Sequence, residues 1–260
     1  MRFVKRDVSL EAFYTKPHVV QECLKHINVF RYDFVMDPCA GDGAFSRCIK
    51  GCFAIDIDPA HHSVLKYDFF DYEIPCKDTL VIGNPPFGIS CELSNKFLLK
   101  CFRSQNVKTI AFILNETYKK HTKQRIIPKG WCINKIVDIG SDAFTLNGES
   151  KHVPSSFFIF ERGGKDLRAK MIDSTPDFSF GTPEDFDFFL FGASYNSKPL
   201  RISTLPQPNN RGHYLKSNIG VNKLKERLEK LNIRGFSGCN GGLYYVTKKE
   251  LTTAYVRRYC

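Results

Sequence analysis

Four residues that could do chemistry, Asn84, Pro85, Pro86 and Phe87, follow directly on the apolar run Thr79–Ile82 and Gly83. The Asn84 side-chain oxygen and the Pro85 carbonyl oxygen can accept hydrogen bonds, and the two prolines restrain the backbone between them. Two acceptors aimed at a planar amine would favour a pyramidal nitrogen with a localised lone pair. With Phe87 stacked on the group that bears the amine, these four residues are predicted to be catalytic and to need no strong base.

Two carboxylates, Asp37 and Asp56, end the two apolar runs that precede this one. Ligands bind beyond the carboxyl ends of parallel strands, and an acid about 20 residues after a glycine turn holds ribose hydroxyls. The turn Asp37-Pro38-Cys39-Ala40-Gly41-Asp42-Gly43 allows a close backbone approach but has no lysine for phosphates. The sequence therefore predicts a site for a ribose-bearing ligand without a phosphate chain, and S-adenosylmethionine fits that description.

The elements that must position these residues are strands alternating with helices, which predict an α/β, Rossmann-like fold with a mostly parallel sheet covered on both faces. Helices are expected over residues 17–27, 44–49, 61–65 and 92–102, and strands over 34–37, 52–55, 79–82, 109–114, 131–139 and 156–160. Residues 1–165 are predicted to form a catalytic domain. Residues 166–260 are predicted to form a basic recognition lobe or insertion, with a helix over 221–231 and a strand around 243–246.

The positive charge is concentrated at the end of the chain. Residues 195–260 hold 13 lysines and arginines against 3 acids, whereas the other 194 residues hold 25 against 24. A segregated basic region predicts a nucleic-acid partner whose binding weakens steeply with salt. The candidate contacts are Lys119, Lys120, Lys123, Arg125, Arg211 and Lys216.

Other classes of protein are disfavoured by what the sequence lacks. No apolar run approaches the roughly 20 residues that span a bilayer, and the start has no apolar core of a secretory signal. The ten cysteines are scattered, with no C-x-x-C pair, so no metal site is expected. Such cysteines suit a reducing compartment, cytoplasmic or nuclear, with no membrane partner.

The order of these motifs resembles the class I S-adenosylmethionine-dependent methyltransferases, and more narrowly the N6-adenine methyltransferases of the gamma motif order. The resemblance covers roughly residues 10–165. It is carried by Phe13-Tyr14-Thr15-Lys16-Pro17, which has a lysine inserted in an F-x-T-P segment, and by Asp37–Phe45, Asp56-Ile57-Asp58, Tyr67-Asp68-Phe69 and Asn84-Pro85-Pro86-Phe87.

The resemblance implies methylation of the N6 amino group of an adenine that is flipped out of its stack in a duplex. Asp68 would accept from the amino group of the cofactor adenine and Phe69 would pack on its ring. Phe144 and His152 lie in the segment that would pack against the flipped base, and the sequence does not choose between them. The implied cofactor-binding residues are Phe13, Thr15, Pro17, Asp37, Cys39, Ala40, Gly41, Asp42, Gly43, Asp56, Ile57, Asp68, Phe69 and Asn84.

Two alternatives stay open at the level of sequence. A protein glutamine-N5 methyltransferase of the release-factor type uses the same four-residue motif, because a glutamine amide is also planar and bears an amine. An inactive methyltransferase fold could serve as a nucleic-acid-binding subunit. DNA and RNA are not distinguished, nor is the oligomeric state.

Overall fold

The computed structural model describes residues 13–146, 148–164, 166–168, 170–192, 200–207, 212–231 and 246–260. The chain divides into two compact units. The first unit comprises Met1–Tyr118 and Thr122–Arg168, and the second comprises Lys119–His121 and Ala169–Cys260. The predicted strand around 243–246 falls mostly outside the described residues.

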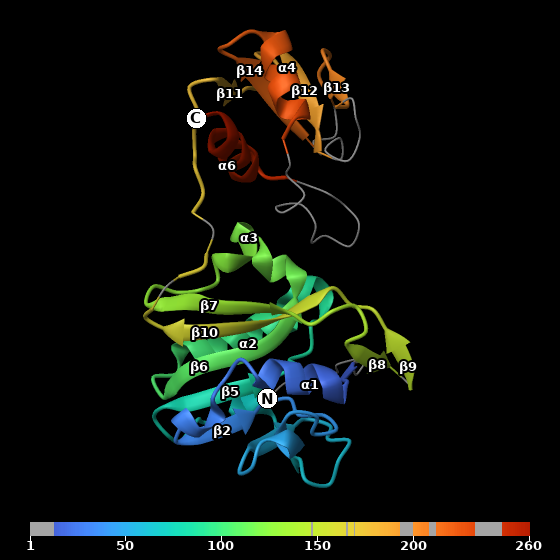
Figure 1. The fold of residues 1–260 in the computed structure, drawn as a ribbon, viewed down its shortest axis with the longest axis vertical. Helices are drawn as coiled ribbons and strands as arrows, with labels where there is room; N and C mark the ends of the chain where they lie inside the picture. Colours follow the sequence, from blue (N-terminus) through green and yellow to red (C-terminus); the bar gives the residue numbers. More distant parts are fainter. Residues whose placement is uncertain are drawn as a thin grey trace, which may run out of the picture. The chain divides into compact units, whose positions relative to one another are not determined.

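The first unit is built on a seven-stranded sheet (Figure 1), in the order β4-β3-β2-β5-β6-β10-β7. The five strands from β4 to β6 are parallel, and β10 runs antiparallel to both of its neighbours. This order reverses between β2 and β5, as in doubly wound folds. The predicted Rossmann-like fold with a mostly parallel sheet is confirmed. The strands are β2 (Phe34–Asp37), β3 (Phe53–Asp56), β4 (Leu65–Lys66), β5 (Thr79–Gly83), β6 (Val107–Asn115), β7 (Trp131–Asp138) and β10 (Ser155–Arg162).

The central strands are apolar throughout because both of their faces are covered. In β5, Leu80 and Ile82 join the core that contains helix α1 (Pro17–Leu24), whereas Val81 joins the core that contains α2 (Glu92–Arg103). Successive side chains of a strand point to opposite faces, so an unbroken apolar run feeds both cores.

Two of the expected helices do not form. Residues 44–49 contain only a three-residue 3-10 helix, Ser46–Cys48, because Gly41, Gly43 and Gly51 all have positive φ and turn the chain on either side. The segment 61–65 is too short to offset the cost of starting a helix. Its end instead becomes β4, where Leu65 pairs with Ile55 at the edge of the sheet.

A small antiparallel sheet, β1-β8-β9, ties the N-terminal motif to a later hairpin. Its strands are β1 (Tyr14–Thr15), β8 (Phe144–Leu146) and β9 (Glu149–Lys151). Lys16, the residue inserted in the F-x-T-P segment, pairs with Asp142 and donates to the Ser150 hydroxyl. The insertion therefore anchors the motif to the hairpin. Short helices complete this part of the chain: 3-10 turns at Val29–Arg31, Phe69–Asp71, Ile89–Cys91 and Glu116–Lys119, and α3 at His121–Gln124.

The second unit has an antiparallel sheet in the order β11-β14-β12-β13, with helices α4 and α6. Leu224 and Leu228 of α4 and Leu251 and Tyr255 of α6 are buried in its core. Among the described residues of the chain, no helix has the length and apolarity to cross a membrane. The elements are β11 (Phe178–Phe180), β12 (Phe188–Phe191), β13 (Ile202–Ser203), β14 (Gly212–Ser217), α4 (Val221–Glu229) and α6 (Lys248–Tyr259).

Candidate functional site

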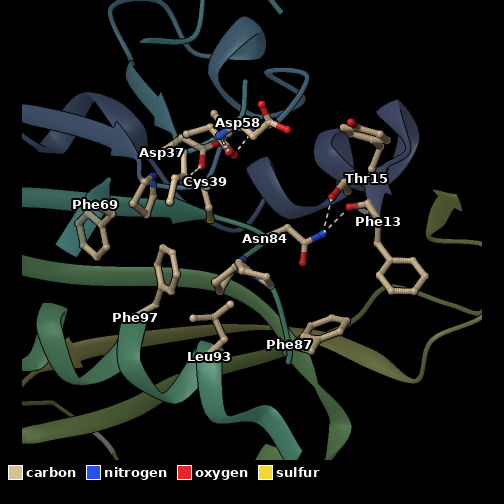
Figure 2. A pocket seen from close by; sticks show the side chains of 18 of the residues that line it. Phe13, Thr15, Asp37, Cys39, Asp58, Phe69, Asn84, Phe87, Leu93 and Phe97 are labelled. Carbon is tan, nitrogen blue, oxygen red and sulfur yellow. Dashed lines mark hydrogen bonds between the residues drawn. The ribbon is translucent and has the colours of Figure 1, made fainter. Parts of the chain in front are cut away.

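A pocket of 540 Å³ lies in the first unit, at the carboxyl ends of β2, β3 and β5 (Figure 2). This edge is where the strand order reverses, the place where doubly wound sheets bind ligands. The pocket brings together all four residues that were predicted to be catalytic and most of those that were predicted to bind the cofactor. The residues that were predicted from the sequence and that line the pocket are Phe13, Thr15, Asp37, Cys39, Ala40, Gly41, Asp42, Asp56, Ile57, Asp68, Phe69, Asn84, Pro85, Pro86 and Phe87.

The lining of this pocket is strongly acidic. Five carboxyl side chains line it, and no lysine, arginine or histidine is found among the described residues that do so. An acidic lining repels phosphates and favours a ligand that carries positive charge, hydroxyl groups or amino groups. The five acids are Asp37, Asp42, Asp56, Asp58 and Asp68.

Asp56 holds the glycine turn in place. One of its carboxylate oxygens accepts from the Gly41 N–H at 2.8 Å, and the other accepts from the Asp58 N–H at 2.9 Å. Gly41 has a φ of +53°, and a Cβ there would lie 3.3 Å from the Tyr14 ring. Each carboxylate oxygen keeps a second lone pair that can accept from a ligand hydroxyl.

Asp37 is the most buried of the five acids, with 2% of its surface exposed. Burial raises its pKa to about 8, against the opposing effect of the Cys39 N–H, which donates to its carboxylate at 3.3 Å. A buried carboxyl without a cationic partner favours its neutral form, and a ligand cation placed beside it would reverse that preference.

Gly83 permits this arrangement, because a Cβ at its position would lie 2.5 Å from an Asp37 carboxylate oxygen. Gly83→Ala should therefore displace the Asp37 carboxylate and weaken binding of the predicted ligand, S-adenosylmethionine, about tenfold or more, equivalent to about 1.4 kcal/mol or more. Isothermal titration calorimetry measures the change. Gly130→Ala is the matched control, since Gly130 also has positive φ but has no atom within 4 Å of a Cβ. Equal affinities in the two variants would contradict this role for Gly83.

The Asn84 side chain has a defined orientation. Its Nδ2 donates to the Phe13 carbonyl oxygen at 3.3 Å and to the Thr15 hydroxyl at 3.2 Å (Figure 2). A carbonyl oxygen can only accept, so the amide nitrogen must face Phe13 and the amide oxygen must face away. That Oδ1 atom is buried and has no hydrogen-bond partner among the described residues. A buried acceptor without a partner is unusual and is ready to accept from a ligand amine.

Phe144 lies behind the site rather than in it. It is fully buried and packs edge-on against both Phe13, with ring centroids 6.2 Å apart, and Phe87, at 6.3 Å. The expectation that Phe144 could face a flipped base is therefore wrong, because none of its surface is free. Its position supports the two rings on either side of it.

Phe69 has less free surface than the predicted ring contact requires. It is 2% exposed and stacks on Phe97, with centroids 5.2 Å apart and planes 15° apart. Apolar surface for a ligand ring is available instead on Ile57, which is 43% exposed, and on the half-buried Phe70. Asp68 accepts from the Phe70 N–H at 2.9 Å through one oxygen, which leaves the other for a ligand.

Two of the predicted cofactor residues do not line the pocket. Pro17 begins helix α1, and Gly43 has the positive φ that the turn requires. Both residues therefore shape the backbone around the pocket and do not face its interior.

The residues that were predicted to contact nucleic acid differ in exposure and in the partners they already have. Lys120 is only 8% exposed, which does not suit the expected phosphate contact, and Lys216 already pairs with Asp185 at 2.5 Å. Lys119 is half-buried and Arg125 is exposed, whereas Arg211 lies outside the described residues. Lys123 donates to the Ser90 carbonyl at 2.7 Å, and the exposed His152 contacts the Ser141 carbonyl at 3.0 Å.

Sequence reasoning missed several lining residues. Leu93 and Phe97 come from α2, one turn apart, and appear in the sequence only as part of an apolar helix face. Tyr14 and Asp58 lie inside the motifs Phe13–Pro17 and Asp56–Asp58, so their place beside predicted site residues was a signal that they could line the pocket. Ile89 directly follows Gly88, and nothing in the sequence separates it from a core residue.

No family model matches the chain. A curated protein of Arabidopsis thaliana, ENHANCED DOWNY MILDEW 2, is 25% identical over 170 residues, which span 58% of this chain but only 12% of that protein. Among solved structures, the 23S rRNA methyltransferase ErmE is similar, with a TM-score of 0.42, 14% identity and coverage of 94% of this chain and 98% of that one. Trm5 of Methanocaldococcus jannaschii in complex with adenosine has a TM-score of 0.40 and 20% identity, with coverage of 61% and 52%.

Proposed function

We propose that this protein is an S-adenosylmethionine-dependent methyltransferase that acts on the N6 amino group of adenine in nucleic acid. The observation that carries the proposal is the Asn84 amide, whose nitrogen is held by Phe13 and Thr15 and whose buried oxygen has no partner among the described residues. Such an acceptor can take a hydrogen bond from an amine N–H of a ligand.

The acidic wall of the pocket fits S-adenosylmethionine. Asp37 would pair with the ammonium group, and the remaining lone pairs of Asp56 would accept from the ribose hydroxyls. Asp68 can accept from the adenine amino group, while Ile57 and Phe70 offer apolar surface for the ring. When bound, the cofactor would supply an electrophilic methyl group on a sulfonium.

At the reacting amine, the chain would act by orientation. The Asn84 oxygen and the Pro85 carbonyl would accept the two amine hydrogens, which localises the nitrogen lone pair. Phe87, supported by Phe144, would hold the base in line. Held in this way, the amine nitrogen would be oriented to take up the methyl group that a bound cofactor would supply, with the electron pair of the broken bond retained by the cofactor. The proton that the methylated nitrogen gives up would pass to water.

The second unit is the proposed recognition lobe. Its residues, Lys119–His121 and Ala169–Cys260, include 16 lysines and arginines against 8 acids, so it carries most of the net charge of +11. Several of these cations are already paired, among them Arg227 with Asp177 and Lys249 with Asp173. The phosphate contacts would therefore come from a subset of the basic residues.

The test is transfer of labelled methyl from S-adenosylmethionine to DNA, RNA and a release-factor protein in parallel, with nucleoside and amino-acid analysis of the product. The proposal expects N6-methyladenosine or its deoxy form. Label on glutamine alone would favour the protein methyltransferase instead. Cofactor binding without any transfer to these substrates would favour the binding subunit.

A further inference from the structure

Ile89 is an exposed apolar residue beside the proposed catalytic motif. It follows Gly88 directly, lines the pocket and leaves 82% of its surface exposed. Of the large apolar side chains in the described residues, only Phe30 is more exposed, at 90%. Single exposed apolar residues are common on protein surfaces, so the inference depends on where Ile89 lies and how it is held.

The backbone around Ile89 is unusual. Gly88 has a φ of 66°, and both Ser90 and Cys91 are left-handed, with φ of 53° and 64°. Two successive non-glycine residues in this region are uncommon, and such conformations persist where the surroundings impose them.

Contacts on both sides impose this conformation. The Ser90 carbonyl accepts from Lys123 Nζ at 2.7 Å, and Cys91 Sγ lies 3.5 Å from the Thr117 hydroxyl. Gly88 packs against Leu93 so closely that a Cβ there would lie 3.0 Å from the Leu93 Cβ. The turn is therefore fixed, and it directs Ile89 away from the core at the rim of the pocket.

We propose that Ile89 is an intercalating residue that occupies the gap left in a stacked strand when the target adenine enters the pocket. This inference rests on the proposed function and narrows its substrate to an adenine inside a stacked, helical segment. The buried Asn84 oxygen can be reached only by a base that has left its stack, and an inserted apolar side chain offsets the lost stacking. A β-branched residue is suited to this, since its χ1 is stiff. Lys123 donates to the carbonyl of Ser90, the residue after Ile89, and so places a cation beside Ile89 where it can contact a flanking phosphate.

The experiment compares two forms of an oligonucleotide that the wild type methylates. One is a full duplex, and the other has abasic residues in place of both neighbours of the target adenine, so that the base has no stack to leave. Ile89→Ala is expected to lower the ratio of kcat/KM on the duplex to kcat/KM on the abasic form about tenfold. Ile89→Leu keeps the apolar volume and should restore most of the ratio. Phe30→Ala, which removes a similarly exposed apolar group, should leave the ratio unchanged.

The possible outcomes separate the two proposals. An unchanged ratio in Ile89→Ala, or an equal loss on both oligonucleotides, would overturn the role of Ile89 and leave the proposed function standing. A wild type that methylates no adenine in any nucleic acid would overturn the proposed function, and with it the intercalating role of Ile89. Cofactor affinity and thermal unfolding, measured for each variant, identify any loss that comes from misfolding.

Discussion

Asn84→Ala is expected to lower kcat for methyl transfer about 10²–10³-fold, the range found when one preorganised hydrogen-bonding group is removed from a catalytic site. In the proposed mechanism the Asn84 oxygen accepts from the reacting amine, so the loss should appear mainly in kcat and less in the affinity for S-adenosylmethionine, which the other pocket residues would also hold. Single-turnover transfer and calorimetry measure the two quantities separately.

Thr15→Val is the matched control for Asn84. It removes one of the two acceptors that hold the amide nitrogen but leaves the Phe13 carbonyl and the reactive oxygen in place. The expected loss is about fivefold, since a neutral hydrogen bond contributes about 1 kcal/mol. A larger loss in Thr15→Val than in Asn84→Ala would contradict the assignment of the acceptor.

The sheet could be predicted from the sequence because its strands are buried on both faces. The runs around Val81 and Phe112 are unbroken apolar stretches, a pattern typical of a strand that is covered on both faces. The helices expected over 44–49 and 61–65 failed for a different reason. The first segment has apolar residues at helical spacing, but glycines with positive φ flank it. The second has only the adjacent Val64 and Leu65 as apolar residues, and its end pairs with the free edge of β3. In segments this short, tertiary contacts determine which secondary structure forms.

The candidate site could be predicted as far as its residues lie in contiguous motifs. Asp37, Asp56 and Asn84 each follow a strand, and parallel strands bring their carboxyl ends to one edge. Contacts between distant segments could not be read from the sequence, such as Gly83 packing on Asp37 or Phe144 supporting Phe87. These depend on side-chain packing, for which a single sequence carries no signal.

The buried Asp37 carboxyl predicts a pH-dependent cofactor affinity. Its pKa is raised to about 8 by burial in the free protein, and a bound ammonium favours the charged form and lowers that pKa. Binding therefore releases a proton below pH 8. The affinity for S-adenosylhomocysteine, which keeps the ammonium but not the sulfonium, should rise by up to about tenfold per pH unit between pH 6 and 7.5. The rise should level off above pH 8, where the Asp37 carboxyl is already ionised in the free protein.

Asp37→Asn should bind this ligand about 10²–10³-fold more weakly at pH 8, since it leaves a buried cation without its partner, and its affinity should be flat from pH 6 to 7.5. Asp58→Asn is the control: it removes an exposed carboxylate from the same pocket and should keep the slope. Calorimetry in buffers of different ionisation enthalpy counts the protons released. A slope that persists in Asp37→Asn would assign the titration to another group. An affinity that falls between pH 6 and 7.5 would mean that the ligand prefers the neutral carboxyl, which an ammonium group cannot do.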